Sequence, residues 1–452
     1  MKKGDIIELE LIDIANGGDC VGRYQGLAVF VAAGIPGEKV SVRVTERKKS
    51  YARAELLEIN EEVETRVDPE CAVYGACGGC QLMHIDYEEQ LKYKQKMVKD
   101  LLERIAKLDR IEVEPVIGSE FPFSYRNKAQ FPLSLDKEGK IVTGFYQQGT
   151  HKVVVHHNCG IQHPLINRTV NTTLDILNDY NLTVYDETLH SGVLRHLIIR
   201  VGICTNQVLL TIVTSDKQLP FADEISKRVM EEMTEVVGVI QNINPEQTNV
   251  IMGNEDRILS GNDYYIDYIG KTKYAISSHS FFQVNTLQTK KLYDQIVKFL
   301  SLEGNETVVD AYCGIGSISL YIAGNTGRVI GIEEVSDAIE DAEHNAEINN
   351  IDNCSFIIGK VEKELPELIK EGIKPDLLVF DPPRKGLDKQ VIEITISVKP
   401  KRIVYVSCNP ATLARDLKLF KEHYQVKKVQ PVDMFPQTYH VESVVLLERK
   451  EA

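Results

Sequence analysis

The sequence predicts a multidomain protein with an N-terminal OB-like β-barrel, a central α+β domain and a C-terminal doubly wound α/β domain. Short strands separated by glycine-rich turns occupy residues 1–58, and a glycine-rich segment with three cysteines follows them. From about residue 276, strands alternate with helical patterns, which is typical of a mostly parallel sheet covered on both faces. A chain of 452 residues suits about three domains, and we place them at 1–58, 59–275 and 276–452.

The composition excludes several classes of protein. Residues 1–11 alternate charged and apolar side chains, so they form no signal peptide, and no apolar run is long enough for a membrane span. The net charge of −14 disfavours a general nucleic-acid binder and leaves room only for local basic patches. Nine cysteines without a secretion signal indicate a cytoplasmic protein in which metal binding or catalysis is more frequent than disulfide formation. We expect a monomer with no membrane or DNA partner.

Residues 1–58 have the pattern of five short strands. Apolar and polar residues alternate around Leu9 and Val42, and the segments Asn16–Asp19 and Pro36–Gly37 supply turns. A small barrel of this kind resembles the TRAM domain, an RNA-binding module. Its late part carries a basic cluster that suits either a solvated edge or contacts to an RNA backbone, formed by Arg43, Arg47, Lys48, Lys49 and Arg53.

A candidate metal site follows the barrel. Cys71, Cys77 and Cys80 lie within ten residues, and the glycines near them let the backbone wrap closely around a ligand. Cys159, far downstream, is the fourth candidate ligand. Four thiolates fit a 4Fe-4S cluster or a tetrahedral zinc ion, and we favour the cluster because zinc sites more often pair two motifs of two-residue spacing. The alternative is a set of unrelated core cysteines.

Residues 87–108 predict a helix after the cysteine segment. Asp86 is placed as its N-cap, and apolar residues recur at helical spacing from Leu91 to Leu108. This helix is a candidate for packing on the C-terminal domain. It also carries four lysines, typical of a solvated surface, at Lys92, Lys94, Lys96 and Lys99.

The middle of the chain, from about residue 111 to 275, predicts mainly strands. One helix is expected near 221–233. The basic segment 125–128 is predicted to be a surface turn, with contact to RNA phosphate as the alternative.

Three strand ends of the C-terminal domain carry residues that suit a nucleoside cofactor. The turn Asp310–Ser317 has two glycines and lacks the third glycine of a pyrophosphate-binding loop, which disfavours a dinucleotide. Glu333 lies at the next strand tip, where an acidic side chain binds ribose hydroxyls. Asp381 lies at a third strand tip. A cofactor without phosphates fits this pattern, and we predict S-adenosylmethionine.

A further strand delivers a thiol to the same edge. Val404–Val406 predicts a buried strand that ends at Ser407, and Pro410 begins the next helix. Cys408 therefore lies where ligands of open α/β sheets bind. A thiol at that edge suits a nucleophile, although most cysteines are small core residues.

Several motifs occur in a fixed order along the chain, namely Ser280–Asn285, Asp310–Ser317, Glu333, Asp381–Gly386, Ser407–Pro410 and His440–Glu442. With the barrel and the cysteine set, they resemble the bacterial 23S rRNA uracil-5 methyltransferases over essentially the full length of the chain. The resemblance implies methyl transfer from S-adenosylmethionine to carbon 5 of one or two uridines in 23S rRNA. It also implies roles for individual residues: Cys408 as nucleophile, Glu442 as base, and Gln283, Tyr312, Glu333 and Asp381 as methyl-donor contacts. Lys360 departs from the pattern, because an acidic or amide residue commonly approaches the adenine there.

The chemistry of this transfer needs a nucleophile and a base. Carbon 5 of uracil is a poor nucleophile, and attack of a thiolate on carbon 6 makes an enolate whose carbon 5 accepts the methyl group. A base then removes the remaining carbon-5 proton, and the thiolate leaves. A free thiol has a pKa of about 8.5, so we expect the site to lower the pKa of Cys408. If the last strand is antiparallel to the others, Glu442 at its start lies on the same rim as Cys408.

The target base must also leave the folded RNA, and Phe281, Phe282 or Tyr312 are candidates to stack on it, with an aromatic core as the alternative.

Three other functions share parts of the pattern. RNA cytosine-5 methyltransferases usually carry a Pro-Cys motif after the fourth strand, which Asp381–Pro383 lacks. tRNA-specific uracil methyltransferases typically lack the barrel and the cluster. A non-catalytic iron–sulfur RNA-binding or assembly protein would leave Cys408 and Glu442 inert.

Overall fold

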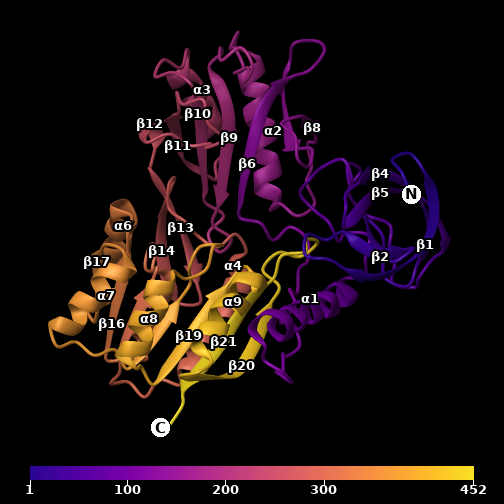
Figure 1. Ribbon diagram of the computed structural model, residues 1–452. Coiled ribbons are helices and arrows are strands. Elements are labelled where there is room, and N and C mark those ends of the chain that lie inside the picture. The colour runs from indigo at the N-terminus through magenta and orange to yellow at the C-terminus, as the bar shows by residue number, and fades with distance from the viewer. Residues whose placement is uncertain (452) are drawn as a thin grey trace.

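The computed structural model describes residues 1–451 and consists of a closed barrel, two seven-stranded sheets and one two-stranded hairpin (Figure 1). No helix within these residues combines the length and apolarity needed to cross a membrane.

The N-terminal part is a closed five-stranded barrel, as the sequence predicts. Its strands pair in the order β1-β2-β3-β5-β4, with β3 and β5 parallel. Side chains alternate along β1, so Ile7, Leu9 and Leu11 point into the barrel. The strands are β1 Ile6–Ile14, β2 Cys20–Tyr24, β3 Leu27–Val31, β4 Lys39–Arg47 and β5 Tyr51–Glu61.

A buried ion pair fixes the barrel to the segment that follows it. The Glu38 carboxyl is fully buried and accepts a hydrogen bond from the Ile35 N–H at 2.8 Å. Arg66 donates to this carboxyl from Nε at 2.6 Å and from Nη2 at 2.8 Å. Because Arg66 also donates to the Ala33 carbonyl, the barrel and the cysteine segment are joined at a defined point.

Helix α1 (Tyr87–Leu101), continued by a π-helical turn at Leu102–Ala106, packs on the C-terminal domain (Figure 1). Asp86 caps it by accepting from the Glu88 N–H at 3.1 Å, in agreement with the sequence analysis. The expectation of a solvated surface is wrong for Lys94, which is 1% exposed and pairs with Asp433. The helical period places Lys94 on the buried face with Gln90 and Val98.

The central sheet has the order β12-β11-β10-β9-β6-β7-β8 and carries helices α2 and α3. The strands are β6 Lys128–Leu135, β7 Ile141–Tyr146, β8 Val153–Val155, β9 Leu194–Val201, β10 Val208–Thr214, β11 Val236–Ile243 and β12 Glu255–Gly261. Helix α3 (Ala222–Glu232) lies where the sequence predicts one. The sequence analysis missed α2 (Pro164–Asn178), because its Thr, Val and Asn residues have low helix propensity, although Pro164 at its start is a helix signal.

The segment 125–128 is not a surface turn. Tyr125 and Asn127 are buried, and Lys128 begins β6. Asn127 donates from Nδ2 to the Gln283 carbonyl at 2.9 Å and to the Thr286 hydroxyl at 3.0 Å, so this segment joins the central sheet to the start of helix α4.

The C-terminal sheet is doubly wound, with strand order β17-β16-β15-β18-β19-β21-β20. Helices α4, α5 and α6 cover one face together with the β13–β14 hairpin, and α7, α8, α9 and α1 cover the other face. Helix α7 was not predicted from the sequence. The strands are β13 Tyr264–Ile269, β14 Thr272–Ser277, β15 Thr307–Ala311, β16 Arg328–Glu333, β17 Cys354–Ile358, β18 Leu377–Phe380, β19 Arg402–Ser407, β20 Tyr424–Val432 and β21 Glu442–Arg449. The helices are α4 Thr286–Leu300, α5 Ser317–Ala323, α6 Ser336–Ile348, α7 Val361–Lys370, α8 Lys389–Val398 and α9 Pro410–Phe420.

Replacing Arg66 by methionine should destabilise the protein strongly, because it leaves the buried Glu38 carboxylate without its partner. Removing one member of a buried pair costs about 3–5 kcal/mol. The matched control is Arg43→Met in the same barrel, which removes an exposed ion pair with Glu55 and should change stability by about 1 kcal/mol or less. Urea unfolding of the two variants checks this, and equal shifts in the midpoint would contradict it.

Candidate active site

Four parallel strands bring the predicted site residues to one rim of the C-terminal sheet. Strands β15, β16, β18 and β19 are parallel neighbours, with Ala311 paired to Ile332 and to Phe380. The residues at or just past their carboxyl ends are the ones singled out in the sequence, namely Tyr312, Glu333, Asp381 and Cys408. Carboxyl ends of parallel strands are where open α/β sheets bind ligands.

The last strand brings Glu442 to the same rim. Strand β21 runs antiparallel beside β19, and Ser443 pairs with Ser407. The predicted antiparallel direction is therefore confirmed. Glu442 precedes Ser443 and Cys408 follows Ser407, so the two residues lie opposite each other at the end of the strand pair. Cys408 is half-buried, whereas Glu442 is 3% exposed.

The loop after β15 is shaped by its backbone. Tyr312 has a φ of +72°, a left-handed conformation that is uncommon for a residue other than glycine and that marks a constrained loop. Gly314 has a φ of +52°, and a Cβ added there would meet only open space, so that side of its backbone is accessible. Asp310 is buried beneath the loop; its Oδ2 accepts from the Ser319 hydroxyl at 2.6 Å, while Oδ1 has no partner within the described residues.

Glu333 is held by backbone amides beside an apolar surface. Its Oε2 accepts from the Gly314 N–H at 3.2 Å, and its Oε1 accepts from the Val335 N–H at 3.1 Å. Val335 and Ile358 next to it are 52% and 55% exposed. An acidic group between two exposed aliphatic side chains suits a ribose with a flat, apolar ring attached. Lys360 forms an ion pair with Glu334 at 3.9 Å.

The predicted aromatic residues divide into two kinds. Phe282 is 4% exposed and belongs to the core, whereas Phe281 is 71% exposed. Tyr312 is half-buried. Gln283 is buried beside them, and its carbonyl is held by Asn127. Phe281 and Tyr312 therefore remain available for stacking, and Phe282 does not.

Burial among carboxyl groups governs the electrostatics of the rim. Burial, followed by the charges of Glu442 and Asp381, raises the pKa of the Cys408 thiol to about 11. The expectation of a lowered pKa for this thiol is therefore wrong. Burial and Asp381 raise the pKa of Glu442 to about 8, and burial and Asp310 raise that of Asp381 to about 7. Arg384 opposes the increase for both Cys408 and Glu442.

Arg384 and His440 are neighbours of these groups to which the sequence analysis gave no role. The Arg384 guanidinium donates to His440 Nε2 at 3.5 Å. Burial and the nearby Arg384 lower the pKa of His440 to about 4, so the imidazole is neutral and can accept this bond. The Arg384 carbonyl accepts from Asn409 Nδ2 at 3.2 Å, which ties the Asp381–Gly386 loop to the Cys408 loop. The sequence signal for both residues was their place in two of the ordered motifs, Asp381–Gly386 for Arg384 and His440–Glu442 for His440.

The four predicted metal ligands line one cavity of about 260 Å³ in the central part of the molecule. Burial and the other three thiols raise the pKa of Cys80 to about 12, which shows that the four sulfurs are close enough to repel one another when ionised. Two lining residues carry polar atoms without a partner within the described chain, His156 Nε2 and Gln162 Oε1. Across residues 1–451, no group of three or more His, Cys, Asp or Glu side chains has the close geometry that holds a metal ion.

A larger hollow of about 1100 Å³ lies at the opposite rim, where the parallel strands begin. It is lined by residues such as Asp376 and Lys401 and contains none of the groups described above.

Comparison with known proteins agrees with this geometry. Residues 86–450 match the family model described as tRNA (Uracil-5-)-methyltransferase, and residues 2–57 match the TRAM domain. A protein of Bacillus cereus named an uncharacterized RNA methyltransferase is 44% identical over 100% of this chain and 98% of its own. A similarly named protein of Listeria innocua is 44% identical over 100% of this chain and 99% of its own. The crystal structure of the Pyrococcus abyssi tRNA (uracil-54, C5)-methyltransferase with S-adenosyl-L-homocysteine has a TM-score of 0.79 and 26% identity, and the match covers 98% of this chain and 100% of that one.

Replacing Glu442 by glutamine should make stability less sensitive to rising pH. The pKa of Glu442 is raised to about 8 in the folded protein, whereas an unfolded glutamate has a pKa of about 4.3. Between these values the folded chain holds a proton that the unfolded chain releases, so wild-type stability falls as the pH rises through this window. We expect the stability of Glu442→Gln relative to wild type to increase by up to about 1.4 kcal/mol per pH unit in this window.

Urea unfolding midpoints measured across this pH window check the expectation. The control is Glu340→Gln, at an exposed position of α6, which should keep a constant difference from wild type. A constant difference for Glu442→Gln as well would mean that this carboxyl is not held protonated.

Proposed function

The chain belongs to the tRNA (uracil-5-)-methyltransferase family, and from this we propose that it transfers the methyl group of S-adenosylmethionine to carbon 5 of one or two uridines in 23S rRNA. Family membership supports an RNA methyltransferase with an RNA substrate. The observation that carries the proposed chemistry is the register of β19 and β21, which sets Cys408 and Glu442 opposite each other. The TRAM barrel supports contact with RNA.

We assign the methyl-donor contacts to Gln283, Tyr312, Glu333 and Asp381. The bound S-adenosylmethionine supplies an electrophilic methyl group. Glu333 is placed to accept hydrogen bonds from ribose hydroxyls, and the exposed Val335 and Ile358 suit the two faces of an adenine. The open space at Gly314 and the unpartnered oxygen of Asp310 fit a polar, phosphate-free ligand at the loop.

Cys408 is the proposed nucleophile. Its sulfur, after loss of the thiol proton, forms a bond to carbon 6 of the uracil, and the electron pair of the carbon 5–carbon 6 double bond moves to the carbonyl oxygen at carbon 4. Carbon 5 is then electron-rich and would form a bond to the methyl carbon, while the bond from that carbon to the sulfonium sulfur breaks and its electron pair stays on the sulfur. Because the pKa of the thiol is raised to about 11 in the free protein, its ionisation depends on nearby positive charge, and Arg384 supplies one such charge.

Glu442 is the proposed base. Its carboxylate removes the remaining proton from carbon 5, the carbon–sulfur bond breaks, and the ring double bond returns while the Cys408 thiolate departs. A base works best when its pKa lies near the working pH, and the pKa of about 8 satisfies this condition.

The proposal also names the class of RNA that the protein methylates. The motif combination favours 23S rRNA, whereas the Pyrococcus abyssi neighbour acts on tRNA and makes tRNA the second candidate. That neighbour matches 98% of this chain, so the barrel does not by itself separate the two substrates as the sequence analysis expected.

We also propose that Cys71, Cys77, Cys80 and Cys159 hold a 4Fe-4S cluster. Their arrangement around one cavity supports a shared group. Both a 4Fe-4S cluster and a tetrahedral zinc ion bind four thiolates. We assign the cluster because zinc sites more often pair two motifs of two-residue spacing, whereas here three cysteines lie together and Cys159 lies far downstream.

The substrate prediction is tested with labelled S-adenosylmethionine and undermodified RNA. We expect methyl groups to enter carbon 5 of uridines in 23S rRNA and not in tRNA. Cys408→Ala should abolish transfer because the nucleophile is lost, whereas Cys204→Ala, at an exposed cysteine of the central domain, should retain it. Transfer to tRNA alone would replace the substrate, and full turnover by Cys408→Ala would refute the mechanism.

The metal prediction is tested by analysis of anaerobically purified protein. We expect about four iron atoms and about four acid-labile sulfides per chain. Cys80→Ser should lower both, whereas Cys204→Ser should not. Zinc in place of iron, or metal retained by Cys80→Ser, would contradict the assignment.

A further inference from the structure

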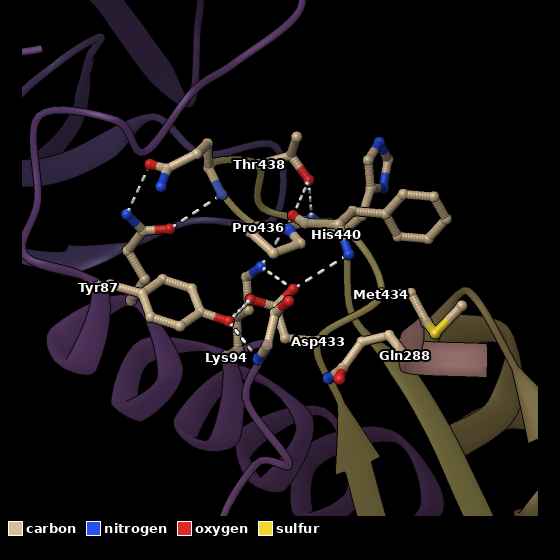
Figure 2. Close-up of polar contacts among 12 residues, drawn as sticks. Tyr87, Lys94, Gln288, Asp433, Met434, Pro436, Thr438 and His440 are labelled. Carbon is tan, nitrogen blue, oxygen red and sulfur yellow. Dashed lines mark hydrogen bonds and ion pairs between the residues drawn. The ribbon is translucent and has the colours of Figure 1, made fainter. Parts of the chain in front are cut away.

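The connection between β20 and β21 is not a simple turn. It consists of residues 433–441 and leads directly into Glu442. Much of it is buried, including Asp433 and Met434 at 0% exposure. Figure 2 shows that polar groups of α1 converge on this 433–441 segment.

A buried ion pair holds the start of the segment. Lys94 of α1 donates to Asp433 Oδ1 at 2.6 Å, and both side chains are almost completely buried, with exposures of 1% and 0% (Figure 2). Lys94 also donates to the Phe435 carbonyl at 3.2 Å, and the Tyr87 hydroxyl donates to Asp433 Oδ2 at 2.9 Å. The lysine and the aspartate are 339 residues apart in the sequence, so this contact joins two distant parts of the chain.

Stability alone does not explain this pair. Desolvation of two buried charges offsets most of their attraction, and well-packed apolar replacements are often equally stable. Burial lowers the pKa of Lys94, which reflects that cost. A buried pair of this kind resists rearrangement, because moving one partner away leaves the other charge buried and uncompensated.

A second set of contacts holds the middle of the segment at Gln437. This residue has a φ of +70°, a strained backbone conformation that persists only where the surroundings fix it. Its carbonyl accepts from the N–H groups of Gln81 and Leu82 at 3.1 Å and 3.0 Å. Its side-chain Oε1 accepts from Gln90 Nε2 at 3.0 Å, and its N–H donates to Gln90 Oε1 at 3.2 Å.

The end of the segment carries the groups of the active site. His440 accepts from Arg384, and Glu442 follows two residues later. Within residues 1–451, the Glu442 carboxyl takes part in none of the hydrogen bonds or ion pairs of the structure, although it is 3% exposed. Its position therefore depends on the backbone that carries it. Strand β21 is held by β19 on one side and by β20 on the other, where Val432 pairs with Glu442. The 433–441 segment begins directly after Val432 and ends directly before Glu442.

We propose that Lys94 is a positioning residue: through Asp433 it fixes the 433–441 segment and thereby holds Glu442 where it can take the carbon-5 proton. This inference rests on the proposed role of Glu442. It predicts that loss of the pair slows removal of that proton more than it slows formation of the bond between Cys408 and the RNA.

The test uses the full-length double variant Lys94→Met/Asp433→Asn with undermodified 23S rRNA and S-adenosylmethionine. Asparagine keeps an acceptor for the Phe435 N–H, which now bonds Asp433 at 3.2 Å, while both charges are removed. We expect turnover to fall about tenfold to a hundredfold, a covalent RNA–protein adduct to accumulate on denaturing gels, and KM for RNA not to rise. Lys96→Met, next to it on the exposed face of α1, is the matched control and should behave as wild type.

Glu442→Gln provides the reference for adduct accumulation. If Glu442→Gln accumulates adduct and the double variant does not, the positioning role of Lys94 is overturned while the proposed function stands. If Glu442→Gln itself accumulates none, the proposed function fails. If the double variant does not fold, Tyr87→Phe is used instead, because it removes one hydrogen bond to Asp433 and leaves the ion pair. An adduct level above that of the wild type then supports the proposal. An adduct level equal to that of the wild type overturns it.

Discussion

The pairing of β21 with β19 is the constraint on which the candidate active site depends. Side chains alternate between faces along a strand, so a slip of one residue in this register would turn Glu442 away from Cys408. Apolar residues on both faces of β21 make such a slip costly, because Val444 and Val445 belong to the two different cores of the sheet. The hydrophobic packing of the domain therefore keeps Cys408 and Glu442 opposite each other.

Burial and neighbouring negative charge favour the protonated forms of the acidic groups at the rim. The pKa values of two carboxyl groups, Asp381 and Glu442, are raised, and so is the pKa of the Cys408 thiol beside them. A cation brought to this rim lowers all of these pKa values together. In the proposed mechanism, the charge of a sulfonium donor would therefore have two effects, because it would activate the methyl group and favour ionisation of the Cys408 thiol.

The sequence was sufficient to predict the features that depend on local pattern. The barrel follows from alternating residues such as Ile7 and Leu9, and the order of polar residues at strand ends follows from the βα rhythm. The features that could not be predicted depend on contacts between distant parts of the chain. Lys94 has the pattern of a surface lysine, and only a partner 339 residues away reveals its burial. The raised pKa of Cys408 was likewise beyond prediction, because it comes from burial in the folded chain and then from the carboxyl groups of Glu442 and Asp381.

The position of β21 has a consequence for how the protein is made. This strand comprises residues 442–449 and follows β20 in the sequence, yet it lies between β19 and β20 in the interior of the sheet. During translation, β20 therefore has no strand of this sheet to pair with until β21 has emerged from the ribosome. A chain that stops before β21 lacks Glu442 and exposes the edges of β19 and β20 that β21 covers. Because unpaired strand edges favour association with other chains, such a product should aggregate rather than bind RNA as an inactive competitor.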